Sequence, residues 1–545
     1  MGKIKFGNAT DVALPWPALV VLISGLALVL GAFIPVVHFA AASDDVGSSL
    51  VEAIADPVIW RALRFTLWQA SLSTILSVVF AVPVALFMHD RGNFAGKRLI
   101  LQLFSIPLAL PQIVAVLAIV GLYGRNGWIT GLLQGLGLPN FTLFGLTGIL
   151  LAHVFFNMPL VVRVMMLALE RQPAEYAKIA AMNAMPWQSR ARFLHWPMAR
   201  AACAQAAILV FMLCVTSFTV VLTLGGGPRA TTLEVAIYHA LTFDFNLARA
   251  TALIALQVTV TASIAILISR FGRETDTGST LFAPDSVGVG GGAKIDAFAY
   301  AILFMPVMFV ALPFANIVAK GVTPETLNVL TKPATVDALI TSVSLASCSA
   351  VLTTLAAFAL GHGICRLAAQ RRFVGDATIV EKFLLNSTAA VLVLPPIVLA
   401  AGWFILFRSF TNPFQFGAVV IVAINTLMAL PFAARLMVPS MLTEARRTDR
   451  LSRQLGITGI SKLRIVDLPL LRKPLLAAFS FAAALSLGDV SVIALYGSQD
   501  LITLPSLILA KMGSYRSDEA HILAFILCVL TAAIMIVGDR QRRAA

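Results

Sequence analysis

Residues 453–472 read RQLGITGISKLRIVDLPLLR, a basic stretch with a glycine near its start and a proline near its end. Residues 181–200 read AMNAMPWQSRARFLHWPMAR and stand 272 positions earlier. At that spacing the two stretches share identical residues at four pairs of positions: Ser189 and Ser461, Arg192 and Arg464, Pro197 and Pro469, and Arg200 and Arg472. Because the chain has 545 residues, the spacing is half its length, and the sequence predicts an internal duplication.

The composition is that of a membrane protein. Hydrophobic residues make up 59% of the chain and charged residues only 12%, whereas soluble domains carry about 25% charged residues. The net charge of +14 does not call for a nucleic-acid partner, because cytoplasmic loops of membrane proteins collect Lys and Arg. The sequence contains neither a phosphate-binding Gly-rich loop ending in Lys-Ser/Thr nor His pairs with metal-site spacing. We therefore expect no nucleotide, metal or other cofactor on this chain.

Twelve apolar runs are long enough to cross a bilayer, and only helices can satisfy the backbone of such runs in lipid. They cover residues 16–40, 64–88, 101–122, 143–167, 203–224, 249–269, 296–318, 338–362, 384–408, 416–438, 475–497 and 520–538. Six runs precede a segment rich in Gly, Ser and Thr, and six follow it. The sequence thus predicts an all-α protein with a first half over 1–272, a cytoplasmic linker over 273–295 and a second half over 296–545.

Lys and Arg residues set the expected orientation. Most of them fall on one side if both termini and the loops 168–202 and 439–474 are cytoplasmic. Six crossings then return the chain to the cytoplasm, so the second half repeats the first in parallel orientation. We expect a multi-pass protein of the bacterial inner membrane.

Each repeated stretch lies in the longest cytoplasmic loop of its half. In the first loop, residues 175–185 (EYAKIAAMNAM) predict a helix that breaks at Pro186. In the second, a helix is expected to stop at Gly456, because glycine adopts positive φ without steric cost. A short surface helix of this kind, present once in each half, suggests docking onto a symmetric partner.

The second loop resembles the Glu-Ala-Ala/Gly/Leu-Pro signature of permeases of binding-protein-dependent ABC importers. Gly456, Leu468 and Pro469 fit that signature, and Arg450 stands at its acidic position. In the first loop Ala180 and Pro197 fit, while Ala184 replaces the glycine, Lys178 the acid and Trp196 the leucine. By this resemblance the coupling residues are Ala180, Ala181, Ala184, Pro197, Arg450, Gly456, Leu468 and Pro469.

The resemblance is greatest to fused thiamine importer permeases, and it rests on two long stretches. These are FMLCVTSFTVVLTLGGGPRATTLEVAIYHAL at 211–241 and ALSLGDVSVIALYGSQDLITLPSLILAKMGSYRS at 484–517. It implies twelve transmembrane helices as two fused six-helix type I ABC importer permease halves in parallel tandem repeat. It also implies two copies of a cytoplasmic ATPase that carries ATP-Mg, a periplasmic substrate-binding protein, and thiamine or its phosphates as cargo. Fused ferric-iron permeases share part of the second stretch, so ferric iron remains an alternative cargo.

The substrate path is expected between the halves, and four residues are candidates for it. Asp489 is an acid within a predicted membrane helix, where carboxylates are costly and usually functional, and Ser217 stands 272 positions before it. Phe218 and Tyr496 offer aromatic faces to a cationic ligand such as thiamine. Glu234 is expected at the outer face. A proton- or sodium-coupled secondary transporter is the rival class, but it would leave the paired loops unexplained.

Overall fold

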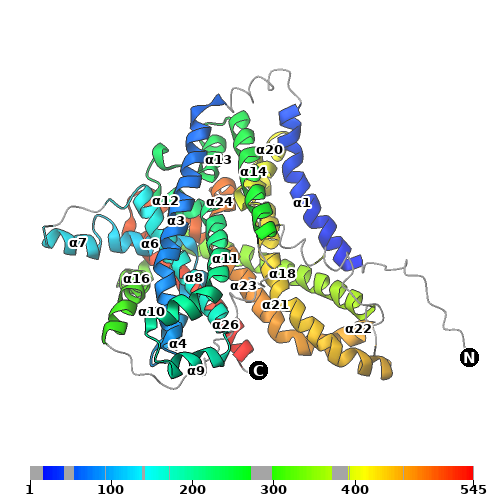
Figure 1. The fold of residues 1–545 in the computed structure, drawn as a ribbon. Helices are drawn as coiled ribbons and strands as arrows, with labels where there is room; N and C mark the ends of the chain where they lie inside the picture. The colour runs from blue at the N-terminus through cyan, green and yellow to red at the C-terminus, as the bar shows by residue number, and fades with distance from the viewer. Residues whose placement is uncertain are drawn as a thin grey trace, which may run out of the picture.

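A computed structural model describes residues 16–41, 55–92, 94–137, 142–170, 172–271, 297–370, 384, 391, 393–457 and 459–543. Within these ranges every regular element is a helix, and eleven helical segments are long and apolar enough to span a membrane. The chain is thus an all-α, multi-pass membrane protein (Figure 1). The linker predicted over 273–295 lies outside the described residues.

The longer helices match the predicted spans closely. They are α1 (Trp16–Ala41), α3 (Pro57–Asp90), α6 (Gln112–Tyr123), α8 (Leu146–Leu169), α11 (Trp196–Val215), α14 (Leu247–Phe271), α16 (Ala297–Gly321), α18 (Pro333–Gln370), α20 (Pro396–Arg408), α21 (Gly417–Gln454), α23 (Leu468–Leu487) and α26 (Ser517–Arg543). Of the ninth predicted span, 384–408, the described helix is α20, whose 13 residues are too few to cross alone.

Shorter helices complete the described fold. They are α4 (Lys97–Leu103), α5 (Ile106–Ala109), α7 (Trp128–Gly135), α9 (Ala174–Met182), α10 (Trp187–Arg190), α12 (Phe218–Leu224), α13 (Leu233–Thr242), α17 (Thr326–Leu330), α22 (Gly459–Lys462), α24 (Ser491–Tyr496) and α25 (Leu504–Gly513). Three predicted spans are consequently broken helices. The run 101–122 divides into α4, α5 and α6, 203–224 divides at α11 and α12, and 475–497 divides at α23 and α24.

The helix boundaries repeat along the chain. α10 and α22 begin 272 residues apart, and so do the π-helical segments Ala191–His195 and Leu463–Asp467 that follow them. α11 and α23 also begin and end 272 residues apart. The sequence repeat therefore has a counterpart in local structure, down to an uncommon π-helical turn.

The first helix before each repeat packs across the molecule onto the later or earlier part of the chain. α1 lies against α20, where the Trp403 indole N–H donates to the Leu28 carbonyl at 2.9 Å. A Cβ on Gly402 would lie 2.7 Å from the Ala32 carbonyl carbon, so only glycine permits this helix crossing. Similarly, α16 lies against α6, and Asn316 Nδ2 donates to the Ala118 carbonyl at 3.2 Å.

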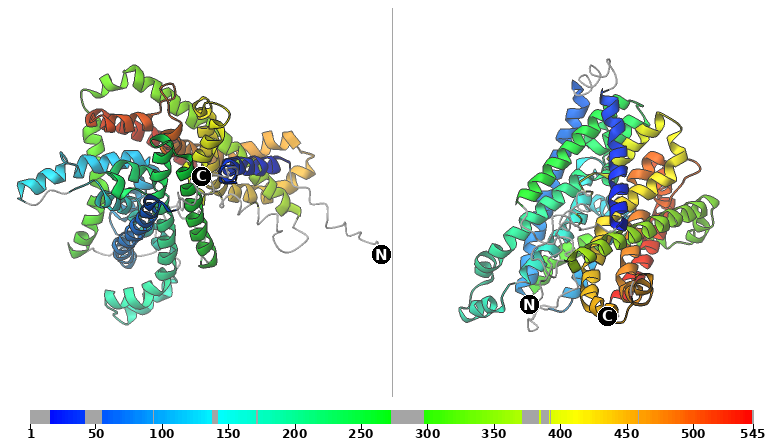
Figure 2. Two further views of the ribbon diagram at one scale, coloured as in Figure 1. Left: turned by 90° about the horizontal axis from the view of Figure 1, so that it is seen from above. Right: turned by 90° about the vertical axis from the view of Figure 1, so that its right-hand side faces the viewer.

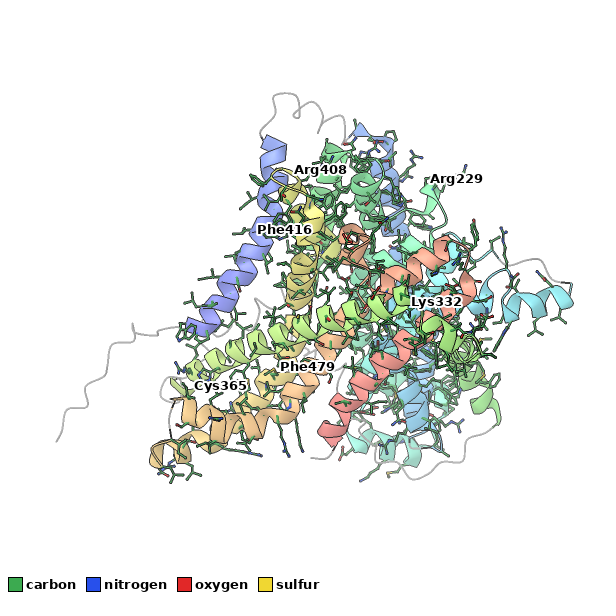
Figure 3. The ribbon with its side chains drawn as sticks, turned by 180° about the vertical axis from the view of Figure 1, so that it is seen from behind. Arg229, Lys332, Cys365, Arg408, Phe416 and Phe479 are labelled. Carbon is green, nitrogen blue, oxygen red and sulfur yellow. The ribbon has the colours of Figure 1, made fainter. Side chains whose placement is uncertain are left out.

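The two long helices α18 and α21 pack against each other and against α23. Figure 3 shows α18 running obliquely between the labelled residues Lys332 and Cys365. Its Ser342 hydroxyl accepts the N–H of Leu504, the first residue of α25, at 2.7 Å. In α3, Thr66 accepts the N–H of Leu233, the first residue of α13, at 3.0 Å. Both bonds satisfy an otherwise unpaired donor at a buried helix start.

Candidate functional site

The first candidate coupling loop is built from α9, a tight turn and α10. Ala180 is buried and Ala181 lies in the same helix, whereas Ala184 is exposed. Ala184 has φ 45°, and the N–H of Met185 donates to the Ala180 carbonyl at 3.0 Å. A left-handed residue with this backbone bond is the usual way to end a helix, although a non-glycine residue there is strained.

The second candidate coupling loop has the same turn at the same spacing. Gly456 has φ 68°, as predicted for a helix stop, and the N–H of Ile457 donates to the Ser452 carbonyl at 2.8 Å. The helix before the turn differs from expectation, because it is the end of the 38-residue α21 and not a separate short helix. Arg450 lies exposed on that end.

The conserved-signature positions that follow the turns lie on the surface of both loops. Pro197 and Pro469 are exposed near the starts of α11 and α23. Leu468 is 42% exposed, and its counterpart Trp196 is 40% exposed. Exposed apolar side chains at matched positions suit a docking surface better than a solvated loop.

The two loops lie at the same end of the molecule. In Figure 1, α9, α10 and α22 all lie at the lower end, and the side view in Figure 2 separates the two loops there. Further apolar side chains point outward from them: Ile179, Met182, Phe193, Leu451, Leu455, Ile460 and Ile465 are 49–86% exposed. The predicted pairing of two surface loops on one end of the protein thus has a structural basis.

The loops are anchored to the helix bundle by different side chains. In the first, Arg190 makes two bonds of 2.7 Å to Asp90 at the end of α3, and His195 lies 3.2 Å from the same carboxylate. In the second, Lys462 occupies the position of Arg190 and pairs with Asp449 at 2.5 Å. The repeat therefore preserves the backbone of the loop and not its anchoring residues.

Two of the four path candidates lie in the first part of the chain. Ser217 occupies the break between α11 and α12, and its Oγ lies 2.9 Å from His153 Nε2. The other ring nitrogen of His153 lies 2.9 Å from Ser73 Oγ. Phe218 is 2% exposed and packs edge-on against Tyr238. His153 was not predicted as part of this cluster, because its partners are 80 and 64 residues away in sequence.

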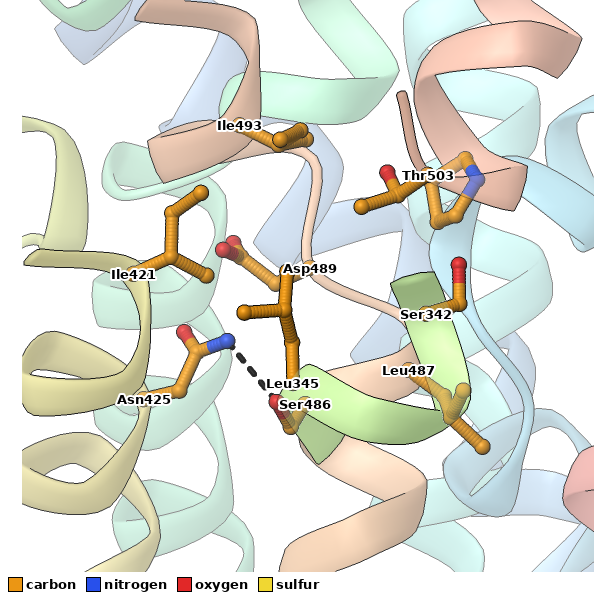
Figure 4. Close-up of a pocket in the computed structure, with 10 residues that line it drawn as sticks. Ser342, Leu345, Ile421, Asn425, Ser486, Leu487, Asp489, Ile493 and Thr503 are labelled. Carbon is orange, nitrogen blue, oxygen red and sulfur yellow. Dashed lines mark hydrogen bonds between the residues drawn. The ribbon is translucent and has the colours of Figure 1, made fainter. Parts of the chain in front are cut away.

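Asp489 does not lie within a helix as expected, but in the break between α23 and α24. Its Oδ1 accepts the Ser491 N–H at 3.0 Å, whereas its Oδ2 is buried without a hydrogen-bond partner among the described residues. This oxygen borders a cavity of about 10 Å³, shown in Figure 4. Within the cavity wall, Asn425 Nδ2 donates to Ser486 Oγ at 2.9 Å.

Tyr496 is fully buried, where its hydroxyl donates to the Ala400 carbonyl at 3.2 Å and its ring meets Phe404 edge-on. The structure therefore does not gather the four path candidates around one opening. Gly488 brings the second break close to the first part of the chain, since a Cβ there would lie 3.1 Å from Pro111 Cα. Glu234, expected at the outer face, is only 1% exposed within α13.

Paired surface loops on a bundle of membrane helices define a permease subunit of an ABC transporter, and comparison with known proteins supports this class. No protein-family profile matches the chain. The chain is 43% identical over 536 residues to the thiamine transport system permease protein of Brucella abortus, covering 98% of this chain and 97% of that protein. The Escherichia coli protein of the same name is 36% identical over 490 residues, 89% of each chain, and the Haemophilus influenzae protein is 34% identical over 502 residues, 88% of this chain and 90% of that one. The chain belongs to the family of thiamine transport system permease proteins.

Proposed function

We propose that this chain carries thiamine, or its phosphates, from the periplasm to the cytoplasm across the bacterial inner membrane as the permease of an ATP-driven importer. The names and near-complete coverage of its relatives support this cargo. We further propose twelve transmembrane helices in two fused type I halves, 1–272 and 296–545, with both termini cytoplasmic. The 272-residue repeat of helix boundaries supports two equivalent halves.

Two copies of a cytoplasmic ATPase would dock on the two coupling loops. The matched left-handed turns at Ala184 and Gly456 support this pairing, because a symmetric ATPase dimer needs two similar contacts. ATP and Mg²⁺ would bind to the ATPase and not to this chain. Closure of the ATPase dimer would draw the loops together and open the path outward, where a periplasmic binding protein delivers the substrate.

The substrate would pass near the helix breaks that carry Ser217, Phe218, Asp489 and Tyr496. Broken helices at membrane depth are favoured places for substrate contact, because their backbone polar groups are not all used within the helix. The contact of Gly488 with Pro111 indicates that the conformation described here is closed at this level. The negative charge of Asp489 would favour a cationic substrate such as thiamine.

Two alternatives receive less support. Ferric iron would require several oxygen, nitrogen or sulfur ligands together, and the described residues contain no group of three or more His, Cys, Asp or Glu that could hold a metal. A proton- or sodium-coupled secondary transporter would not need two equivalent loops at one end.

The test is uptake of labelled thiamine by cells that lack this chain and every other thiamine importer. We expect uptake to return with the wild-type chain and not with Gly456→Asp, which places a charged side chain on the left-handed turn. Gly135→Asp is the matched control, because Gly135 is exposed, lies on α7 and has no atom near its missing Cβ. Unchanged uptake without the chain would exclude thiamine as the cargo, and the same assay with labelled ferric iron would then test the alternative.

A further inference from the structure

The small cavity beside Asp489 is lined by oxygen-bearing side chains from four separate parts of the chain. Ser342 comes from α18, Asn425 from α21, Ser486 from α23, and Thr503 from the residue before α25. Asp489 contributes a buried Oδ2 that has no hydrogen-bond partner among the described residues. Figure 4 shows these side chains converging from several helices. An unpaired carboxylate oxygen in a buried polar cavity is costly and requires a compensating group.

Local charges favour a cation as that group. None of the residues that line the cavity is Lys, Arg or His. The Ser491 N–H bonds to Asp489 Oδ1 at 3.0 Å and so favours the ionised carboxylate. The carboxylate also follows directly after the carboxyl end of the 20-residue α23, where the helix dipole is negative. Both the side chain and the helix end therefore attract positive charge.

The size of the cavity limits its occupant. A volume of about 10 Å³ accommodates the centre of roughly one water-sized particle. Thiamine, with two rings, is far too large for it in this conformation. Hydroxyl, amide and carboxylate oxygens are ligands of hard cations, and a single carboxylate matches a single positive charge better than the several carboxylates typical of Ca²⁺ sites.

The matched place in the first part of the chain satisfies its own polar groups. There Ser217 stands in the position of Asp489, and His153 stands in the position of Asn425. His153 bridges Ser217 and Ser73 with two contacts of 2.9 Å each. This cluster has no carboxylate and no need of an ion, so the chain offers one such site and not two.

We propose that the Asp489 cavity binds one alkali-metal cation, Na⁺ or K⁺, with Asp489 as the charged ligand and neighbouring hydroxyl and amide oxygens as neutral ligands. The ion neutralises the carboxylate and ties α18, α21 and α23 to the loop before α25. The consequence is a second half whose stability depends on the monovalent cation in solution. This inference concerns the permease alone and does not depend on which substrate it carries.

The test uses the purified full-length permease in detergent, without partner proteins. Thermal unfolding is followed in NaCl, KCl and choline chloride at equal ionic strength, and binding of ²²Na⁺ is measured with unlabelled NaCl or KCl as competitor. We expect one ion per chain and a saturable rise of about 2–4 °C in the unfolding midpoint over choline. The more effective competitor identifies the preferred ion.

Three variants make the test specific. Asp489→Asn should abolish the cation-dependent shift, and Ser486→Ala should weaken ion binding about 10-fold while leaving the carboxylate in place. Asp500→Asn, which changes an exposed acid of the same region, should behave as wild type. The proposal is overturned if choline stabilises as well as Na⁺ and K⁺, or if the shift persists in Asp489→Asn. It is also overturned if only pH changes stability, since the cavity then holds a protonated carboxyl group.

Discussion

Gly456 offers the sharpest test of the coupling loops, because the cost of replacing it is almost purely conformational. Its φ is 68°, and no atom lies within 4 Å of the position that a Cβ would take. A side chain there meets no neighbour but must hold the left-handed conformation, which costs about 1–2 kcal/mol for most L residues. Asn tolerates this conformation better than Ala, and β-branched Val tolerates it least.

The expected effect on partner binding follows from this cost. If the ATPase binds only the loop with its native turn, a cost of 1–2 kcal/mol lowers affinity by at most about 5- to 30-fold. We expect the order of weakening Gly456→Asn, then Gly456→Ala, then Gly456→Val. For Ala184→Gly, relief of the strained φ of 45° is partly offset by the greater freedom of unfolded glycine, about 0.5–1 kcal/mol. That variant should bind as well as wild type or slightly better.

The assay is equilibrium binding of the purified ATPase subunit to the permease in lipid nanodiscs, with thermal unfolding measured on the same samples. Gly135→Val, on α7 far from both loops in Figure 1, is the control for added bulk. If Gly456→Asn binds as weakly as Gly456→Val, side-chain bulk and not backbone conformation matters. Wild-type affinity in all three Gly456 variants would refute the role of the turn altogether.

Two further predictions concern packing. Asp90→Asn should destabilise the first loop by about 1–3 kcal/mol, because it removes the charge from two 2.7 Å bonds to the partly exposed Arg190; thermal unfolding measures this, and Glu444→Gln, which loses only an exposed ion pair, should cost less than about 0.5 kcal/mol. Gly402→Val should separate α1 from α20 and lower the unfolding midpoint, because its side chain would overlap the Ala32 backbone. A spectroscopic distance measured between α1 and α20 that stays unchanged in Gly402→Val would contradict this reading.

The sequence predicted what depends on local composition. Apolar runs had to be helices, since lipid offers no partner for backbone polar groups, and eleven of the twelve predicted runs contain such a described segment. The turn at Gly456 was predicted because glycine alone takes positive φ without cost. Its equivalent at Ala184 was recognised only through the repeat, because alanine gives no such signal.

Tertiary contacts decided the rest. Hydropathy does not distinguish one continuous span from two helices joined at a break, so the runs containing Ser217 and Asp489 were predicted as unbroken. The partners of Asp489 come from residues as distant as Ser342 and Asn425, and those of His153 from Ser73 and Ser217. Such pairings form only when separate helices pack together. The sequence by itself determined which segments enter the membrane and where the loops repeat, because these follow from the chemistry of neighbouring residues. Only the tertiary structure decided which polar groups meet inside, because burial and charge compensation depend on every helix at once.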